Sequence, residues 1–172
     1  MLLNDWELKM LFISFFTLIA SSAAECPDSW FSLGIYCYHV STARMDWGSS
    51  EQVPWSKPYF HINFVLQYCW SIAGGYLAEF ESLEEELAVE SVLSIDNNYW
   101  IGLSDFAQEG TWRWHDSHKE PSYTNWGPGE PDNHGGDENC ANKEYRYYGG
   151  KWNDQGCSEV NDAHALCQME KL

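Results

Sequence analysis

The chain has 172 residues, a length typical of one domain, and its formal net charge is −17. This excess of acid repels phosphate backbones and anionic membranes, and no basic patch offsets it, so nucleic acid is excluded as an expected partner. The same charge favours solubility or an affinity for cations.

The first 24 residues have the pattern of a leader that is removed. "MLFISFFTLIA" (Met10–Ala20) is an apolar run too short to cross a bilayer comfortably, and small residues follow at Ser22 and Ala24. We therefore predict a secretory signal peptide over 1–24 and a mature domain over 25–172, with no membrane insertion after the signal is removed. A membrane anchor is the alternative. The expected location is secreted and extracellular.

The cysteine count agrees with an oxidising compartment. The six cysteines are Cys26, Cys37, Cys69, Cys140, Cys157 and Cys167. None lies in a C-x-x-C pair, which argues against a zinc ribbon or a redox pair. An even number in an exported chain predicts three disulfides, and six cysteines permit about 15 pairings.

The first half of the domain contains the expected helices. Residues 26–38 alternate aromatic and polar side chains around Gly34, which predicts a hairpin, and 41–58 read as a loop with no periodicity. Apolar residues then recur at helical spacing up to the stop at Gly74 and Gly75. This face consists of Phe60, Phe64, Val65, Tyr68 and Ile72.

A second helix is predicted in "FESLEEELAVESVLSI", residues 80–95. Ser82 and Glu85 form a capping box at its start. The predicted apolar face consists of Leu83, Leu87, Ala88, Val92 and Ile95. We interpret the acidic run Glu84–Glu86 as a solvated face near the positive end of the helix dipole.

After Asn98 the period changes to that of strands. "YWIGLSD", "TWRWHD", "CANKEYRYY", "GKWND" and "ALCQME" read as short strands separated by turn residues. Two helices ahead of a run of strands predict an α+β domain.

Six stretches with distinctive composition stand in a fixed order. They are "CPDSWFSLGIYCY", Cys69–Ser82 with "GGYLAEFES", "WIGLSD" (100–105), "GEPDNHGGDENC" (129–140), "KWNDQGC" (151–157) and "ALCQ" (165–168). Together they span nearly all of 26–168. In this order they resemble the C-type lectin-like domain family, in its long form and of the secreted single-domain type.

The resemblance implies a fold of two helices, a small and mainly antiparallel sheet, and a long calcium-binding loop region. It also implies the pairs Cys26–Cys37, Cys69–Cys167 and Cys140–Cys157, with Trp100 to Leu103 mainly in the core. In sugar-binding members, one calcium is held by a tripeptide, a downstream Glu and a Trp-Asn-Asp triplet. The positions implied here are Glu130, Asp132, Glu138, Asn153 and Asp154, with a cis Glu130–Pro131 bond.

The chemistry of these residues agrees with that implication. Calcium is a hard cation that takes six to eight oxygen ligands, whereas zinc prefers His or Cys. Vicinal sugar hydroxyls could replace water on the metal while contacting Glu130, Asp132, Glu138 and Asn153, with His134 as a further candidate for sugar contact. No arrangement of residues suggests a nucleophile, so we do not expect an enzyme.

The tripeptide "EPD" departs from the family's mannose-type EPN and galactose-type QPD. Asp132 adds charge for the metal but removes an N–H donor to the sugar, so we expect a blurred preference that leans to mannose and fucose. A second, auxiliary calcium set is implied at Asp105, Glu109, Asn133, Glu138 and Asn139. Two of its places carry Asn where Asp is common in the family, so we expect weak or no occupancy.

The sequence therefore predicts a secreted, calcium-dependent carbohydrate-binding lectin, similar to innate recognition lectins. Any homo-oligomer would form through the domain itself, since no collagen-like or coiled-coil segment is present. The alternative is a structural or protein-binding member of the family that has lost sugar binding.

Overall fold

The computed structural model describes residues 25–47, 64–158 and 163–171, so the predicted signal peptide over 1–24 lies outside the described residues. The strands are β1 (Phe31–Leu33), β2 (Tyr36–Met45), β3 (Tyr76–Leu77), β4 (Tyr99–Ser104), β5 (Arg113–Trp114), β6 (Cys140–Glu144), β7 (Lys151–Gln155) and β8 (Ala163–Glu170). The helices are α2 (Phe64–Ala73), α3 (Leu83–Glu90), the four-residue α4 (Tyr145–Tyr148) and the 3-10 turn η1 (His134–Gly136).

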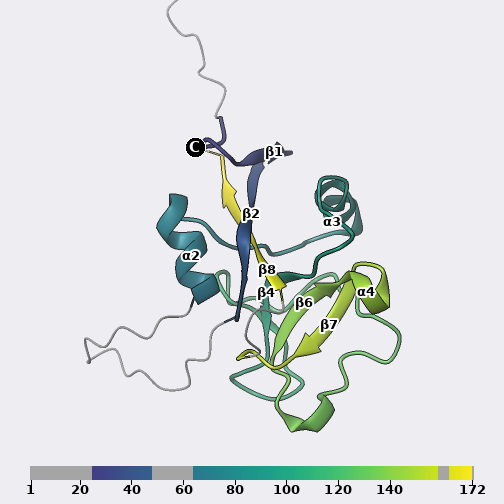
Figure 1. Cartoon of the computed structure of the whole chain (residues 1–172). Coiled ribbons are helices and arrows are strands. Elements are labelled where there is room, and N and C mark those ends of the chain that lie inside the picture. Colours follow the sequence, from purple (N-terminus) through teal and green to yellow (C-terminus); the bar gives the residue numbers. More distant parts are fainter. Residues whose placement is uncertain (1–24, 48–63, 159–162, 172) are drawn as a thin grey trace, which may run out of the picture.

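The sheet joins the two ends of the domain. Its strands follow the order β1-β2-β8-β4-β6-β7, with β3 paired to β8 and β5 paired to β4. The β4–β8 pair is parallel and every other pair is antiparallel. Helices α2 and α3 lie on opposite sides of the β2–β8 pair (Figure 1). The predicted α+β architecture with a mainly antiparallel sheet is confirmed.

The N-terminal hairpin forms where it was predicted, with Gly34 in the left-handed region at φ 56°. However, β2 continues to Met45, so the prediction of loop from residue 41 is wrong for 41–45. Strand pairing overrides the weak local pattern, because Arg44 and Met45 pair with His164 and Ala163 of β8. Asp46 and Trp47 belong to no strand or helix, as predicted, and the remainder of that predicted loop, 48–58, lies outside the described residues.

Helix α2 ends at Ala73, directly before Gly74 at φ 70°, as the glycine pair predicted. Its predicted apolar face is only partly borne out. Of its members, Tyr68 is half-buried, but Ile72 is 39% exposed; Cys69, which was not assigned to this face, is fully buried. Phe60 and the side chains of Phe64 and Val65 lie outside what the structure describes.

Helix α3 buries a different face from the one predicted. Its capping is as expected, since the Ser82 side chain accepts a hydrogen bond from the Glu85 amide. The predicted apolar face is wrong. Its four large residues, Leu83, Leu87, Val92 and Ile95, are 49–76% exposed, and the helix ends at Glu90. Val89 and Glu86 are fully buried instead, so the interpretation of Glu84–Glu86 as a solvated face is wrong at Glu86.

The strand predictions mostly hold. Strand β4 is the centre of the core: Trp100, Ile101 and Leu103 are fully buried, as expected for this stretch. The predicted strand over 140–148 is wrong in its second half, because β6 stops at Glu144 and Tyr145–Tyr148 form α4. The turn is closed by Gly149 at φ 64°, a conformation that favours glycine at a helix end.

The three disulfides are Cys26–Cys37, Cys69–Cys167 and Cys140–Cys157, as the family resemblance implied. The last of these joins the start of β6 to the chain just after β7. Among the residues that the structure describes, no helix is both long enough and apolar enough to cross a membrane.

Candidate functional site

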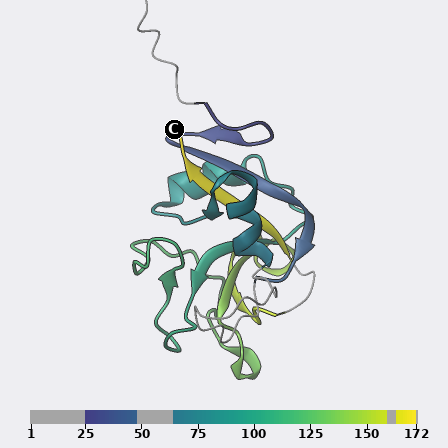
Figure 2. The ribbon, with the colours of Figure 1, turned by 90° about the vertical axis from the view of Figure 1, so that its left-hand side faces the viewer.

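The acidic stretch predicted to bind metal forms a long loop beside β7. Its first part is attached to that strand by backbone hydrogen bonds: the Trp152 amide donates to Asn125 O at 2.8 Å, and the Gly127 amide donates to Trp152 O at 2.7 Å. The loop then runs through η1 at the end of the molecule opposite the N-terminal hairpin (Figures 1 and 2). Residues 127–139 are therefore brought next to Asn153 and Asp154 of β7.

Three of the predicted ligands converge where this loop meets β7. Carboxylate oxygens of Glu130, Asp132 and Asp154 all lie within 4.8 Å of one another. The Glu130–Pro131 peptide bond is cis, as the family resemblance implied. Asp154 is buried, Glu130 is half-buried and Asp132 is exposed, so the group opens to solvent on one side.

Backbone amides of the loop hold the carboxylate of Asp154. Its Oδ1 accepts a hydrogen bond from the Asp132 amide at 3.1 Å, and its Oδ2 accepts one from the Asn133 amide at 2.7 Å. Asn133 adopts a left-handed conformation (φ 47°), which turns the chain so that successive amides point inward. Asp154 is thus fixed before any ligand arrives.

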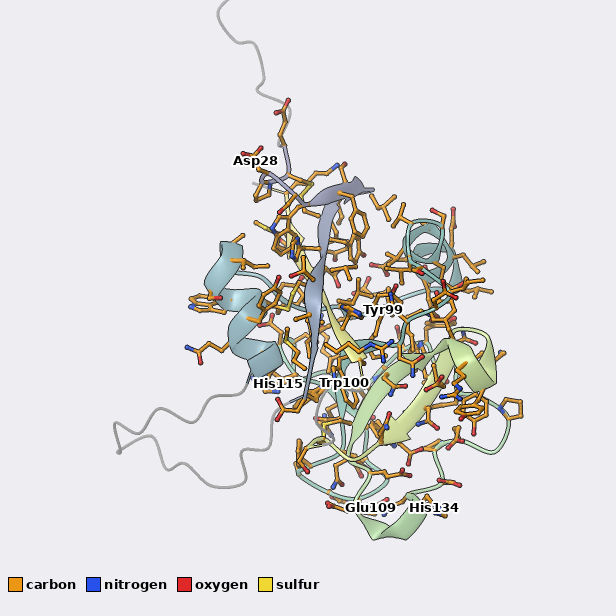
Figure 3. The ribbon with its side chains drawn as sticks, in the orientation of Figure 1. Asp28, Tyr99, Trp100, Glu109, His115 and His134 are labelled. Atoms are coloured by element: carbon orange, nitrogen blue, oxygen red, sulfur yellow. A yellow bond between two sulfur atoms is a disulfide. The ribbon has the colours of Figure 1, made fainter. Side chains whose placement is uncertain are left out.

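Glu138 lies beside this group of three carboxylates and is not part of it, and Asn153 directly precedes Asp154 on β7. The His134 amide donates to both Glu138 Oε2, at 2.6 Å, and Asp132 Oδ1, at 3.0 Å. The Asn153 side-chain amide donates to Asp154 O at 2.6 Å. Since an amide group has two N–H donors, one donor of Asn153 remains for a ligand. The His134 side chain is exposed at this same end of the molecule (Figure 3).

The electrostatics of the site disfavour ionised carboxylates in the absence of a cation. Burial is the main cause that raises the pKa of Glu138 to about 7, and the nearby Asp154 and Asp132 raise it further. Burial likewise raises the pKa of Glu130, whose Oε2 is buried with no hydrogen-bond partner. The sequence did not predict a group that titrates near neutral pH.

The second predicted set is more dispersed. Asp105 is 2% exposed; its Oδ2 accepts from the Gly110 amide at 2.8 Å, and its Oδ1 is buried without a partner. The Asp105 amide donates to Asn139 O at 3.2 Å, and Asn133 Oδ1 accepts from the Glu138 amide. Glu109 is exposed. In the described ranges, no group of three carboxylates like the one at Glu130 forms here.

Sequence reasoning missed Tyr148. Its hydroxyl donates a hydrogen bond to Glu130 Oε1, and its ring lies against Gly127, where an added methyl carbon would be 2.9 Å from the ring. The tyrosine was assigned to a strand, although the following Gly149–Gly150 pair is a helix-end signal that could have placed it in a turn.

The comparisons with known proteins agree with this fold and loop. The model of the Lectin C-type domain family matches residues 62–169. CD209 antigen from Symphalangus syndactylus is 34% identical over 147 residues, which are 84% of this chain and 32% of that protein. Perlucin from Haliotis laevigata is 40% identical over 75 residues, 44% of this chain and 46% of that protein. The chain thus spans less than half the length of these two relatives.

Among solved structures, the carbohydrate-recognition domain of cow CD23 is similar, with a TM-score of 0.70 and 26% identity. The alignment covers 87% of this chain and 99% of that one. Fold and site together define a disulfide-linked α+β domain that presents an acidic loop at one end. The chain belongs to the C-type lectin domain family.

Proposed function

We propose that this protein is a secreted, calcium-dependent lectin that binds glycans through a metal held by Glu130, Asp132, Glu138, Asn153 and Asp154. The observation that carries the proposal is the convergence of Glu130, Asp132 and Asp154 on one small volume. Like charges in such proximity repel one another, so a divalent cation among them would stabilise the arrangement.

The residues fit a calcium ion. The donor set is made of carboxylate and amide oxygens, which a hard cation prefers, and no imidazole or thiolate belongs to it. Glu130 Oε2 is a buried acceptor without a partner, and a ligand or water would satisfy it. Calcium, when bound, would provide a Lewis-acidic centre that vicinal sugar hydroxyls can join.

The side chains around the metal would then determine the sugar specificity. Ionised Glu130, Asp132 and Glu138 only accept hydrogen bonds, so they suit hydroxyl donors. The remaining N–H of Asn153 suits a sugar oxygen that accepts, and the exposed His134 side chain could touch the sugar. A site with this few donors is expected to hold mannose or fucose with a blurred preference. Binding involves no bond cleavage, so no enzymatic activity is proposed.

The relatives support a glycan ligand. The cow CD23 domain was solved in the presence of a GlcNAc2Man3 oligosaccharide, and the similar domain of murine dendritic cell inhibitory receptor 2, at 28% identity and a TM-score of 0.69, was solved with an N-glycan. For the auxiliary set at Asp105 and Glu109 we propose weak or no calcium binding, so that one tight ion is expected per chain.

The test is a glycan array read with calcium and with EDTA, for the wild type and Asp154→Asn. Asp137→Asn is the matched control, since Asp137 is an exposed acid of the same loop outside the proposed ligand set. We expect calcium-dependent binding in the wild type and control and its loss in Asp154→Asn. Calcium uptake without any glycan signal would favour the protein-binding alternative. No calcium uptake by the wild type in calorimetry would refute the proposal.

A further inference from the structure

A fully buried ion pair contacts the start of the loop that carries Glu130 and Asp132, residues 123–139, called the ligand loop below. The side chains of Glu86, on α3, and Lys143, on β6, are both 0% exposed, and the Lys143 ammonium donates to Glu86 Oε1. Glu90 is a second carboxylate partner, with Oε1 2.7 Å from Lys143 Nζ. Charges of this kind are rarely buried unless they are paired and hydrogen-bonded.

Every hydrogen-bonding position of the pair is used. The three N–H donors of Lys143 go to Glu86, Glu90 and, at 2.8 Å, Gly150 O. Glu86 Oε1 also accepts from Trp152 Nε1 at 2.8 Å. Glu86 Oε2 accepts from the Tyr123 hydroxyl at 2.7 Å and from Asn125 Nδ2 at 3.2 Å. A fully satisfied network fixes its members in one arrangement.

The partners of Glu86 are the two segments that carry the proposed calcium ligands. Tyr123 and Asn125 begin the loop that leads to Glu130 and Asp132, while Trp152 precedes Asn153 and Asp154 on β7. Trp152 and the loop are also joined by backbone hydrogen bonds through Asn125 and Gly127. The Glu86 carboxylate on α3 therefore hydrogen-bonds to both segments of the proposed site, the loop and β7.

Aromatic packing links the hydrogen bond between Glu86 and Trp152 to the start of the loop. The Trp152 ring is fully buried. The rings of Tyr123 and Trp126 pack against it in edge-to-face contacts, with ring centroids 5.7 Å away in each case. Phe80 and Trp114 complete the cage at 6.5 and 5.8 Å. Within this cage the indole N–H donates to Glu86, and the rings of Tyr123 and Trp126, from the start of the loop, pack against the indole.

We propose that Glu86 and Lys143 are positioning residues for the ligand loop: they hold residues 123–127 and β7 at the separation that brings Glu130, Asp132 and Asp154 together. This inference rests on the proposed function for its meaning, but it concerns residues that touch neither metal nor sugar. It also gives a role to the burial of Glu86 on α3.

The experiment compares four variants at a temperature well below their melting points. Glu86→Gln removes the charge, and Tyr123→Phe removes one donor while keeping the ring. Glu84→Gln is the charge control, because Glu84 is exposed on the same helix. Leu77→Ala is the stability control, because Leu77 is 1% exposed and belongs to the other core cluster, away from Trp152.

Two quantities are measured: amide hydrogen exchange over residues 125–133 in EDTA, and the affinity for calcium alone by calorimetry. In Glu86→Gln, we expect exchange in this segment to be faster and calcium affinity weaker, each by about tenfold, the size of a lost charge-assisted hydrogen bond. Tyr123→Phe should change both by roughly threefold in the same direction. Both controls should stay within about twofold of the wild type.

Loop exchange in Glu86→Gln no faster than in Leu77→Ala would overturn the inference. If Glu86→Gln does not fold, Tyr123→Phe measured against the same control decides the matter. A wild type that takes up no calcium would refute the proposed function, while the exchange comparison without metal would still decide whether Glu86 orders the loop.

Discussion

The hydroxyl of Tyr148 donates a hydrogen bond to the carboxylate of Glu130, across 18 residues of sequence. This contact raises the pKa of Tyr148 to about 12, because an ionised phenol would face a carboxylate. The phenol therefore remains a donor throughout the physiological range. Glu130 is thus oriented from α4 on one side, while its other oxygen, Oε2, has no partner.

Tyr148→Phe should weaken calcium binding about fivefold to tenfold, because Glu130 loses the donor that orients it and a typical hydrogen bond contributes about 1 kcal/mol net. The measurement is calorimetric titration with calcium at pH 7.5. Tyr147→Phe is the matched control, since Tyr147 is the adjacent residue and is 71% exposed. Equal affinities for the two variants would show that the contact does not organise the site.

Calcium affinity should fall steeply as the pH drops below 7. The pKa of Glu138 is raised to about 7, so protons compete with calcium for this carboxylate at mild acidity. Ionisation of one group with this pKa changes about tenfold between pH 8 and pH 6, and the calcium affinity should change by a similar factor. Glu138→Gln should bind more weakly and lose most of this pH dependence. A wild-type affinity that is the same at pH 8 and pH 6 would contradict the assignment.

The metal-free protein should show the opposite trend. A carboxyl group whose pKa is raised from 4.5 to about 7 by folding contributes stability below pH 4.5, and this contribution is lost as the pH rises to 7. In EDTA, the melting temperature of the wild type should therefore rise relative to that of Glu138→Gln as the pH falls from 7.5 to 5.5. Thermal unfolding of both proteins at the two pH values gives the comparison, and a constant difference would refute the assigned pKa.

Two buried disulfides close loops of very different length, 98 residues for Cys69–Cys167 and 17 for Cys140–Cys157. In the chain-entropy model, the longer loop stabilises more by about 1.5 kcal/mol, because the unfolded chain loses more freedom. Replacing both cysteines of the longer bond by alanine should thus destabilise more than the same change in the shorter one. Urea unfolding of the two double variants measures the difference. The reverse order would show that native-state contacts of the bonds outweigh loop entropy.

Much of the fold followed from the sequence because local signals and the fold agreed. The Ser82 cap, the Gly74 stop and the buried stretch at Trp100–Leu103 are each determined by a few neighbouring residues. Such features depend on hydrogen bonds and packing within the element, so periodicity and capping rules predict them.

The predictions that failed concern features determined by residues that are distant in sequence. The apolar face of α3 was predicted from spacing alone, yet Glu86 is buried because Lys143, 57 residues away, supplies its counter-charge. Periodicity contains no information about such a partner. Similarly, the proposed calcium ligands could be named from motifs, but the donors that hold them are backbone amides and Tyr148, which have no motif. The sequence therefore indicated the proposed ligands better than their supports.

Asp132 should determine both metal affinity and sugar preference. In Asp132→Asn, the new side chain can still accept from the His134 amide, which now donates to Asp132 Oδ1, so the loop should keep its form. The variant loses one negative charge beside Glu130 and Asp154, and we expect calcium affinity to fall by about threefold to tenfold. It gains an N–H donor, so at saturating calcium the signal for mannose and fucose should rise relative to galactose. Glycan arrays of the wild type, Asp132→Asn and the Asp137→Asn control test this prediction. An unchanged ranking of sugars would mean that the side-chain N–H donor that Asp132 lacks does not determine specificity.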